Sequence, residues 1–283
     1  MAENSVAKFN TVIKPTWCPG CGNYGIWNAM KMALFELGLE PHEIFVVYDI
    51  GCFGNGANFL KTYVCHSLHG RTVPVAMGAK LGNKELKVIA MSGDGGAYGE
   101  GIQHLIHAAR YNVDITYIVA DNQRFSLTTG QASPITKKGI ITKTTPFGEI
   151  KEPVNPILLS LNAGASMVAR GFAGDQKHLA EIIKKAIEHK GFSHIDILQP
   201  CVSFNKENTA EWYREVIYKL DEHKYNSSDK ESALIKVEEF EKTGKMPIGI
   251  IYEEKKKTYE DQIPQLKDEP LFEKSLEEIN CFE

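Results

Sequence analysis

Short apolar runs recur along the chain and alternate with longer amphipathic segments. The runs, rich in β-branched residues, fall at residues 44–50, 87–91, 114–120 and 194–198. A continuous apolar run of this length and composition is typical of a strand buried on both faces of a sheet. The segments between them that repeat apolar residues at helical spacing are 25–37, 102–111 and 177–189. This alternation predicts an α/β fold with a mostly parallel sheet flanked by helices.

The pattern becomes less regular in two places. Residues 122–156 are rich in Gly, Pro, Ser, Thr and Lys and directly follow a predicted strand, so we expect a long functional loop. Beyond Cys201 the chain is more polar and charged. We therefore expect a main domain over residues 1–204 and a C-terminal extension over 205–283 that packs on the core or on a partner subunit. Its charged end is either a solvated tail or a segment that wraps the partner.

The overall composition excludes several classes of partner. The chain has 283 residues, of which 43% are hydrophobic, and a net charge of −4 with Lys and Arg spread throughout. That charge gives no basic surface for nucleic acid or an anionic membrane. No stretch approaches the roughly 18 apolar residues of a spanning helix, and the N-terminus has no pattern of a signal peptide. We expect a cytoplasmic protein without nucleic-acid or membrane partners.

A glycine-rich motif follows the second predicted strand. Gly93, Asp94, Gly95 and Gly96 come directly after the run 87–91, and Asn122 follows the run 114–120. One strand–helix–strand unit would bring the carboxyl ends of these two strands to the same edge of the sheet. We therefore expect Asp94 and Asn122 to face each other there.

The residue types in this unit suit a metal-bound phosphate. Mg²⁺ takes one or two side-chain oxygens from a protein and completes its shell with phosphate oxygens, water or backbone carbonyls. Asp94, Asn122 and the carbonyl of Arg124 are candidates for the protein's share. Gly95 and Gly96 would let the backbone approach the phosphates beside a helix N-terminus. The motif alone also occurs as an ordinary turn of α/β proteins, and it does not identify the cofactor.

Four of the six cysteines form a second candidate site. Cys18 and Cys21 lie on a Gly/Pro turn before a predicted helix, while Cys52 and Cys201 each follow a predicted strand. Because strand ends share one edge, four thiolates can converge there and hold either Zn²⁺ or an iron–sulfur cluster. One close pair with two distant single cysteines favours a cluster over zinc. The alternative is that Cys52 and Cys201 are small buried apolar residues.

Several motifs, taken in order, resemble the β subunit of 2-oxoacid:ferredoxin oxidoreductases. They are WCPGCGNYGIWNA, DIGCFGN, LHGR, GDGGAYGEGIQHLIHAARYNVDITYIVADN, LTTGQASP and ILQPC. The resemblance extends from about Pro15 to about Tyr252. It also covers the GDG motif and later Asn that thiamine-diphosphate enzymes share. It therefore implies the thiamine-diphosphate-binding fold, with Mg²⁺ holding the diphosphate.

The resemblance also implies site residues. A [4Fe–4S] cluster would be bound by Cys18, Cys21, Cys52 and Cys201, whereas Cys65 and Cys281 match no ligand position. The implied cofactor contacts are Ile50, Gly51, Cys52, Phe53, His69, Asp94, Gly95, Gly96, Asn122, Arg124 and Ser126. Of these, His69 is expected to hydrogen-bond to the cofactor or the substrate.

The activity implied by the resemblance is oxidative decarboxylation of a 2-oxoacid to acyl-CoA and CO₂. Coenzyme A would be the co-substrate, and electrons would pass through the cluster to ferredoxin. Activity would require an α (or fused γα) subunit, because the domain covering the aminopyrimidine ring belongs to that partner. Two alternatives stay open from the residues: a non-redox thiamine-diphosphate decarboxylase or synthase, and a non-catalytic zinc-binding subunit.

The substrate prediction rests on two departures from the family pattern. Relatives that accept 2-oxoglutarate often carry a basic residue after IGCxG and Lys in LTKGQ, whereas this chain has Asn55 and Thr129. A second carboxylate is costly to desolvate unless a cation meets it. We therefore expect a preference for pyruvate or another monocarboxylic 2-oxoacid unless the α subunit supplies a cation. Leu127 is expected to form an apolar wall of the pocket or simply to pack in the fold.

Overall fold

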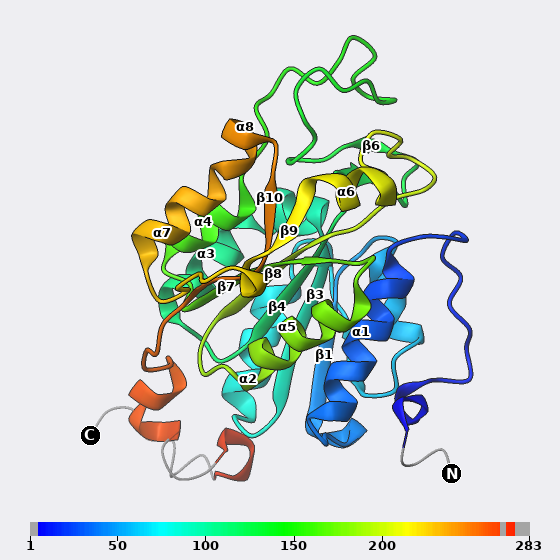
Figure 1. Ribbon diagram of the computed structural model, residues 1–283. Helices are drawn as coiled ribbons and strands as arrows, with labels where there is room; N and C mark the ends of the chain where they lie inside the picture. The colour runs from blue at the N-terminus through cyan, green and yellow to red at the C-terminus, as the bar shows by residue number, and fades with distance from the viewer. Residues whose placement is uncertain (1–4, 267–269, 275–283) are drawn as a thin grey trace.

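The computed structural model describes residues 5–266 and 270–274, and its core is one large sheet (Figure 1). The sheet has eight strands in the order β2-β1-β3-β4-β8-β7-β10-β9. Its strands are β1 (Ile44–Tyr48), β2 (Tyr63–His66), β3 (Lys87–Gly93), β4 (Thr116–Asp121), β7 (Met167–Phe172), β8 (Ser193–Leu198), β9 (Ile217–Lys219) and β10 (Met246–Glu253). The six strands from β2 to β7 are parallel, and β10 pairs antiparallel with β7. The predicted α/β class with a mostly parallel sheet is confirmed.

Helices cover both faces of this sheet (Figure 1). One face packs against α1 (Asn23–Glu36) and α5 (Gln176–Glu188), and the other packs against α2 (Thr72–Gly82), α3 (Ile102–Tyr111), α4 (Pro156–Ala163) and α7 (Lys230–Val237). Strand β3 shows why two cores form, since Ile89 and Met91 join the first while Val88 and Ala90 join the second. Alternate side chains of a strand point to opposite faces, so an uninterrupted apolar run fits this doubly covered sheet.

Helix α5 illustrates how local sequence sets an element. Asp175 caps its N-terminus by accepting a hydrogen bond from the His178 backbone N–H at 3.2 Å. The apolar residues at helical spacing in the predicted segment 177–189 are buried; they are Leu179, Ile182, Ile183, Ala186 and Ile187. The prediction of this helix is confirmed.

The C-terminal extension contributes to the main sheet. It contains α6 (Ala210–Val216), β9, α7, α8 (Glu239–Thr243) and β10, and β10 lies between β7 and β9. The following segment also packs on the chain: Glu260 accepts hydrogen bonds from the Asp114 backbone N–H, and Leu266 is buried. This described part is therefore no solvated tail. The division at residue 204 stays a prediction, and Cys281 lies outside the described residues.

The segment 122–156 is a long loop, as predicted, and forms the green excursion beyond one edge of the sheet in Figure 1. Its regular structure is a small hairpin of β5 (Arg124–Phe125) and β6 (Gln131–Ala132). The remaining short turns are η1 (Val6–Phe9), η2 (Pro41–Glu43), η3 (Phe53–Asn58), η4 (Gly96–Glu100), η5 (Leu220–Glu222), η6 (Glu260–Gln262), η7 (Pro264–Leu266) and η8 (Leu271–Glu273). In the described part of the chain, no helix has the length and apolar character needed to cross a bilayer.

Candidate cofactor and metal site

The carboxyl ends of four neighbouring parallel strands, β1, β3, β4 and β8, lie at one edge of the sheet. In open α/β sheets this edge is where ligands bind. A cavity of about 130 Å³ is found there. It is lined by Ile50, Gly51, Cys52, Phe53, His69, Gly93, Asp94, Gly95, Ala120, Asn122, Arg124, Phe125, Ser126, Leu127 and Thr128. The structure therefore brings most of the predicted site residues together around one space.

The buried environment of the Asp94 carboxylate suits a bound cation. Its side chain is only 1% exposed, and Oδ2 has no hydrogen-bond partner among the described residues. Burial raises the pKa of Asp94 to about 7, with the charge of Asp196 adding to the rise. A buried carboxylate oxygen without a partner is unfavourable unless a positive group meets it. A bound Mg²⁺ would meet this need.

Asn122 faces the same cavity from the end of β4. Its Oδ1 accepts hydrogen bonds from the Arg124 backbone N–H at 2.9 Å and from Ser126 Oγ at 3.4 Å. The Arg124 guanidinium binds Glu207, with Nη2 3.1 Å from Oε2, and is 3% exposed. The backbone carbonyl of Arg124 therefore stays the candidate metal ligand of this residue. Asn122 Oδ1 would coordinate a metal in place of the longer of these two hydrogen bonds, the one from Ser126 Oγ.

The glycines of the motif serve different purposes. A Cβ at Gly93 would meet no atom within 4 Å, so this residue leaves open space in the cavity wall. A Cβ at Gly95 would collide with the Phe125 ring, and one at Gly96 would collide with the Asp49 carboxylate. Gly96 is not among the residues that line the cavity and makes room for Asp49 instead. The helix expected after the motif is first a π-helical turn, η4, before α3 starts at Ile102.

His69 lines the cavity between two carboxylates that the sequence analysis did not single out. Its Nδ1 is 3.3 Å from Asp49 Oδ1, and its Nε2 is 3.5 Å from Glu100 Oε2. Asp49 is fully buried and also accepts hydrogen bonds from the backbone N–H groups of Ile50 and Gly70. Asp49 therefore holds the imidazole in a fixed orientation. The signal available was an acidic residue at the end of a predicted strand.

The cysteine-bearing segments meet beside this cavity. The turn with Cys18 and Cys21 is closed by a hydrogen bond from Cys21 N to Cys18 O at 3.0 Å. It is joined to the Cys201 segment by Gly22 N, which donates to Pro200 O at 3.1 Å. It is joined to Cys52 by Trp17 Nε1, which donates to the Cys52 carbonyl at 2.6 Å. Three chain segments that are distant in sequence are thus fixed together.

The electrostatics of the thiols show that they are near one another. Burial raises the pKa of Cys21 to about 12, and the charges of Cys201, Cys52 and Cys18 add to this rise. Burial likewise raises the pKa of Cys52 to about 11, with further contributions from Cys201 and Cys18. Cys201 is buried, Cys21 and Cys52 are half-buried, and Cys18 is exposed. Four adjacent thiolates become favourable only when a cationic group binds them. The donor set therefore fits a thiolate-bound metal group.

Polar groups are present to support such thiolates. Ser203 Oγ lies 3.2 Å from Cys18 Sγ, and Gln199 Nε2 lies 3.4 Å from Cys21 Sγ. Hydrogen bonds of this kind stabilise ligand sulfurs in metal sites. The thiols are nevertheless adjacent without being grouped as metal ligands, since within residues 5–266 and 270–274 no three His, Cys, Asp or Glu side chains lie in an arrangement that could hold a metal ion. Binding of a metal group would therefore require the four thiols to move closer together. Cys65 lies apart, in β2.

One side chain connects the two candidate sites. Ser126 Oγ is 3.5 Å from Cys201 Sγ and 3.4 Å from Asn122 Oδ1. Cys52 also lines the cavity that Asp94 and Asn122 share. The thiols and the predicted diphosphate site are therefore adjacent at the same sheet edge.

The two predicted substrate residues are not among the residues that line the cavity. Asn55 lies in η3, and Thr129 lies at the rim beside Thr128. Thr129 has a φ of 77°, which is strained for a β-branched residue, and its Oγ1 accepts a hydrogen bond from Lys143 Nζ at 2.7 Å. The sequence analysis missed Lys143 because it lies in a loop with no regular pattern. It brings a cation to the rim where two neutral side chains were predicted.

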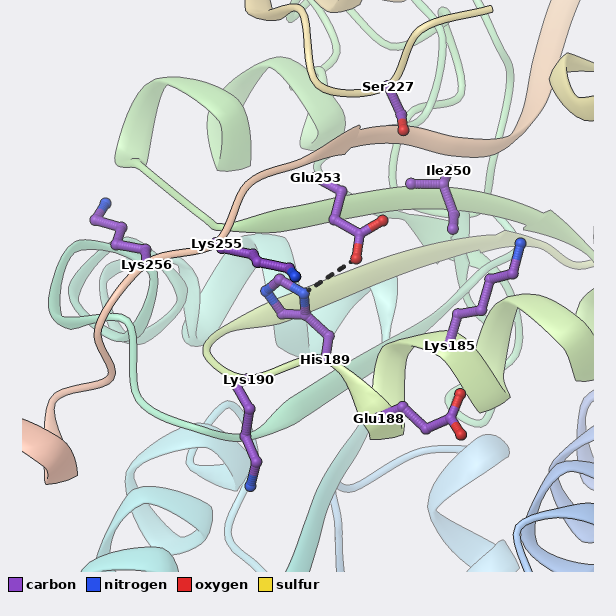
Figure 2. A pocket seen from close by; sticks show the side chains of 9 residues that line it. All are labelled: Lys185, Glu188, His189, Lys190, Ser227, Ile250, Glu253, Lys255 and Lys256. Atoms are coloured by element: carbon purple, nitrogen blue, oxygen red, sulfur yellow. Dashed lines mark ion pairs between the residues drawn. The ribbon is translucent and has the colours of Figure 1, made fainter.

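A larger cavity of about 610 Å³ lies elsewhere and contains none of the predicted residues (Figure 2). It is lined by Lys185, Glu188, His189, Lys190, Ser227, Ile250, Glu253, Lys255 and Lys256. His189 precedes β8, so this cavity is at the opposite edge of the sheet from Cys201. His189 is held there by Glu253, with Nδ1 3.4 Å from Oε1. Chemistry, and not size, selects the smaller cavity as the candidate site.

Two protein families match consecutive parts of the chain. Residues 49–197 match the family described as "Thiamine pyrophosphate enzyme, C-terminal TPP binding domain". Residues 201–268 match the family that describes the C-terminal part of the pyruvate ferredoxin oxidoreductase beta subunit. The first match includes both strands that carry Asp94 and Asn122.

Relatives match most of the chain's length. The 2-oxoacid:ferredoxin oxidoreductase subunit beta of Saccharolobus solfataricus is 44% identical over 88% of this chain and 85% of its own. A 2-oxoglutarate synthase subunit KorB of Methanothermobacter marburgensis is 36% identical, over 82% of this chain and 81% of its own. A solved 2-oxoglutarate:ferredoxin oxidoreductase from Magnetococcus marinus, with 2-oxoglutarate, coenzyme A and succinyl-CoA bound, superposes with a TM-score of 0.87. It is 36% identical in sequence, and the match covers 90% of this chain and 87% of that one.

Proposed function

Because the chain belongs to the β subunits of the 2-oxoacid:ferredoxin oxidoreductases, we propose that it binds thiamine diphosphate, Mg²⁺ and a [4Fe–4S] cluster. With an α (or fused γα) subunit it converts a 2-oxoacid and coenzyme A to acyl-CoA and CO₂. The electrons leave through the cluster to ferredoxin. The observation that carries this proposal is the position of Ser126, within 3.5 Å of both Cys201 Sγ and Asn122 Oδ1.

Each group of residues has one task in this reaction. Thiamine diphosphate, when bound, supplies the carbon nucleophile that adds to the 2-oxo group. Asp94, Asn122 and the Arg124 carbonyl hold the Mg²⁺ that binds its diphosphate, and Gly95 keeps the backbone close. His69, oriented by Asp49, forms a hydrogen bond with cofactor or substrate. Ile50, Gly51 and Phe53 form the facing wall.

Cys18, Cys21, Cys52 and Cys201 hold the cluster beside this cavity. Electron transfer to a cluster becomes fast when the two groups are close, and the shared sheet edge provides that closeness. Ser203 and Gln199 donate hydrogen bonds that favour the bound thiolates.

Exposed apolar side chains around the cavity support the need for an α subunit. Leu127 is 51% exposed, Leu68 is 78% exposed, and Val202 and Phe204 are 39% and 38% exposed. Large apolar residues gathered around a functional cavity are typical of a surface that a partner covers. The α subunit would close the pocket, exclude water and supply the carboxylate that activates the aminopyrimidine ring.

Metal and sulfide analysis of anaerobically purified protein tests the proposal against its alternatives. We expect iron and acid-labile sulfide, whereas a zinc-binding subunit would contain zinc without sulfide, and a non-redox thiamine enzyme would contain neither cluster component. Single replacement of Cys18, Cys21, Cys52 or Cys201 by Ala should abolish the cluster's visible absorbance. The matched control is Cys65→Ala, which should retain it. A cluster lost in Cys65→Ala but kept in Cys201→Ala would show that the ligand set is wrong.

A further inference from the structure

A buried polar cluster lies behind Asp94, on the side of the sheet covered by α3 and α4. Its members are Tyr98, Asp121, Arg170, Asp196 and Tyr213, each no more than 7% exposed. None of them lines the candidate cofactor cavity. Charged groups are rarely buried in such number without a function or full pairing.

The sheet register places these groups together. Arg170 of β7 and Asp196 of β8 are paired residues, and Arg170 Nε lies 3.8 Å from Asp196 Oδ2. Tyr98 Oη donates a hydrogen bond to Asp196 Oδ1 at 2.7 Å. Val119 of β4 pairs with Asp196, and Asp121 follows two residues later on the same face. Asp121 is therefore next to Asp196, immediately before the predicted metal ligand Asn122.

The cluster has an excess of negative charge and too few hydrogen-bond partners. Asp121 Oδ1, Asp196 Oδ2, Arg170 Nε and Tyr213 Oη, like Asp94 Oδ2, lack a hydrogen-bond partner within the described residues. Burial raises the pKa of Asp121, which lies close enough to Asp196 and Asp94 for their charges to add to the rise, and the Arg170 guanidinium opposes this rise only in part. Buried carboxylates are unfavourable unless a cation compensates them. A divalent ion bound to Asp94 would provide such compensation.

We propose that Asp196, held by Tyr98 and Arg170, is a positioning residue that strengthens Mg²⁺ binding by supplying negative charge behind Asp94. This inference rests on the proposed function, since it assumes that Asp94 binds Mg²⁺. Groups behind metal ligands commonly change metal affinity by about 10- to 100-fold when removed.

The test measures Mg²⁺ and thiamine-diphosphate binding to the assembled complex by titration calorimetry. Asp196→Asn preserves shape and removes charge, so the Mg²⁺ concentration for half-saturation, at saturating thiamine diphosphate, should rise about tenfold. Thiamine-diphosphate affinity at saturating Mg²⁺ should remain unchanged. Tyr98→Phe frees the Asp196 carboxylate from its hydrogen bond and should weaken Mg²⁺ binding less, in the same direction.

A matched control separates this role from a structural one. Asp114→Asn removes another largely buried carboxylate, at the opposite end of β4, and should lower the melting temperature without changing Mg²⁺ affinity. If Asp196→Asn and Tyr98→Phe both bind Mg²⁺ like the wild type, the inference is overturned. The inference is also overturned if Asp196→Asn lowers the melting temperature but leaves the Mg²⁺ affinity unchanged. Thiamine-diphosphate binding that does not depend on Mg²⁺ in the wild type would instead overturn the proposed function.

Discussion

At the scale of single residues, Asp94 opposes folding of the cofactor-free chain. Its pKa is raised by burial to about 7, whereas that of an exposed aspartate is near 3.8. The folded state therefore binds a proton that the unfolded state releases as the pH rises from about 4 to 7. By linkage, the contribution of Asp94 to stability is fully present below this range and is lost through it. The carboxylate proposed to bind Mg²⁺ therefore lowers the stability of the cofactor-free chain at neutral pH.

Asp94→Asn should therefore stabilise the cofactor-free chain. The gain in free energy of unfolding should be on the order of 2 kcal/mol at pH 8 and shrink toward pH 5, because the wild-type carboxyl is then protonated. The same variant should lose Mg²⁺-dependent retention of thiamine diphosphate. Denaturant unfolding across this pH range measures the first effect, and cofactor analysis measures the second.

Asp114→Asn provides the matched control with the opposite sign. Burial alone would raise the pKa of Asp114, but the Lys80 and Lys190 ammonium groups hold it below its usual value. That contribution to stability is fully present above about pH 4 and is lost only as the pH falls below that value. Asp114→Asn should therefore destabilise the chain to the same extent at pH 8 and at pH 5, in contrast to Asp94→Asn. If both variants changed the free energy of unfolding at pH 8 in the same direction, the assignment of Asp94 to the metal site would be contradicted.

The choice of 2-oxoacid also depends on single residues. Asn55 and Thr129 are neutral, so a preference for pyruvate or another monocarboxylic acid stays our prediction. Lys143, whose Nζ donates a hydrogen bond to Thr129 Oγ1, brings to this rim a positive charge that would compensate a second carboxylate. Lys143→Met should therefore lower kcat/KM for 2-oxoglutarate by about tenfold, or 1.4 kcal/mol, and leave that for pyruvate nearly unchanged.

Steady-state kinetics of the assembled complex with both substrates decide this point. Thr128→Val is a suitable control, because it alters a neighbouring hydroxyl without removing a charge. A tenfold or greater preference of the wild type for 2-oxoglutarate would contradict the predicted preference. An unchanged ratio in Lys143→Met would exclude Lys143 from substrate selection.

At the scale of elements, the strand ends were predictable and their side-chain partners were not. Continuous apolar runs identify β1, β3, β4 and β8, and parallel strands end at a common edge, which is why Asp94, Asn122 and the cysteines were placed together. The sequence analysis missed β7 because Arg170 and Gly171 interrupt its apolar run. It missed β10 because Pro247 and Gly249 are atypical of strands.

Contacts made by irregular segments account for the rest of the difference. Asp49 directly follows β1 and contacts His69, which lies in the turn after β2. Lys143 donates a hydrogen bond to Thr129 from another part of the 122–156 loop. Neither contact follows from periodicity, because loop backbones have no fixed register. The buried cluster around Asp196 was equally hidden, since its members come from three strands, the turn η4 and helix α6, which are far apart in sequence.

The turn between β3 and η4 yields a prediction for two adjacent glycines. Gly93→Ala should fold normally, because the added methyl would meet no atom within 4 Å, but it should weaken thiamine-diphosphate binding by filling the cavity wall. Gly95→Ala should lower the melting temperature, because its methyl would collide with the Phe125 ring. Thermal unfolding without cofactor, followed by titration with thiamine diphosphate and Mg²⁺, distinguishes the two. Loss of stability in Gly93→Ala with unchanged binding would contradict this account.

At the scale of the whole molecule, the chain resembles half of an active site. One sheet edge carries the candidate diphosphate and cluster sites, and exposed apolar residues such as Leu68 and Leu127 surround it. Among the described residues, those that line the cavity include no Glu that could face an aminopyrimidine ring. We therefore expect a partner subunit to complete the site before the reaction proceeds.

The most direct test of this account is 2-oxoacid- and CoA-dependent reduction of ferredoxin or a viologen dye, measured anaerobically with and without the α subunit. The purified chain, loaded with thiamine diphosphate, Mg²⁺ and iron–sulfur cluster, should show no turnover alone. Addition of the α subunit should produce turnover that requires both CoA and the 2-oxoacid. Robust turnover by the chain alone, or none by an assembled complex that holds its cofactors, would contradict the proposal.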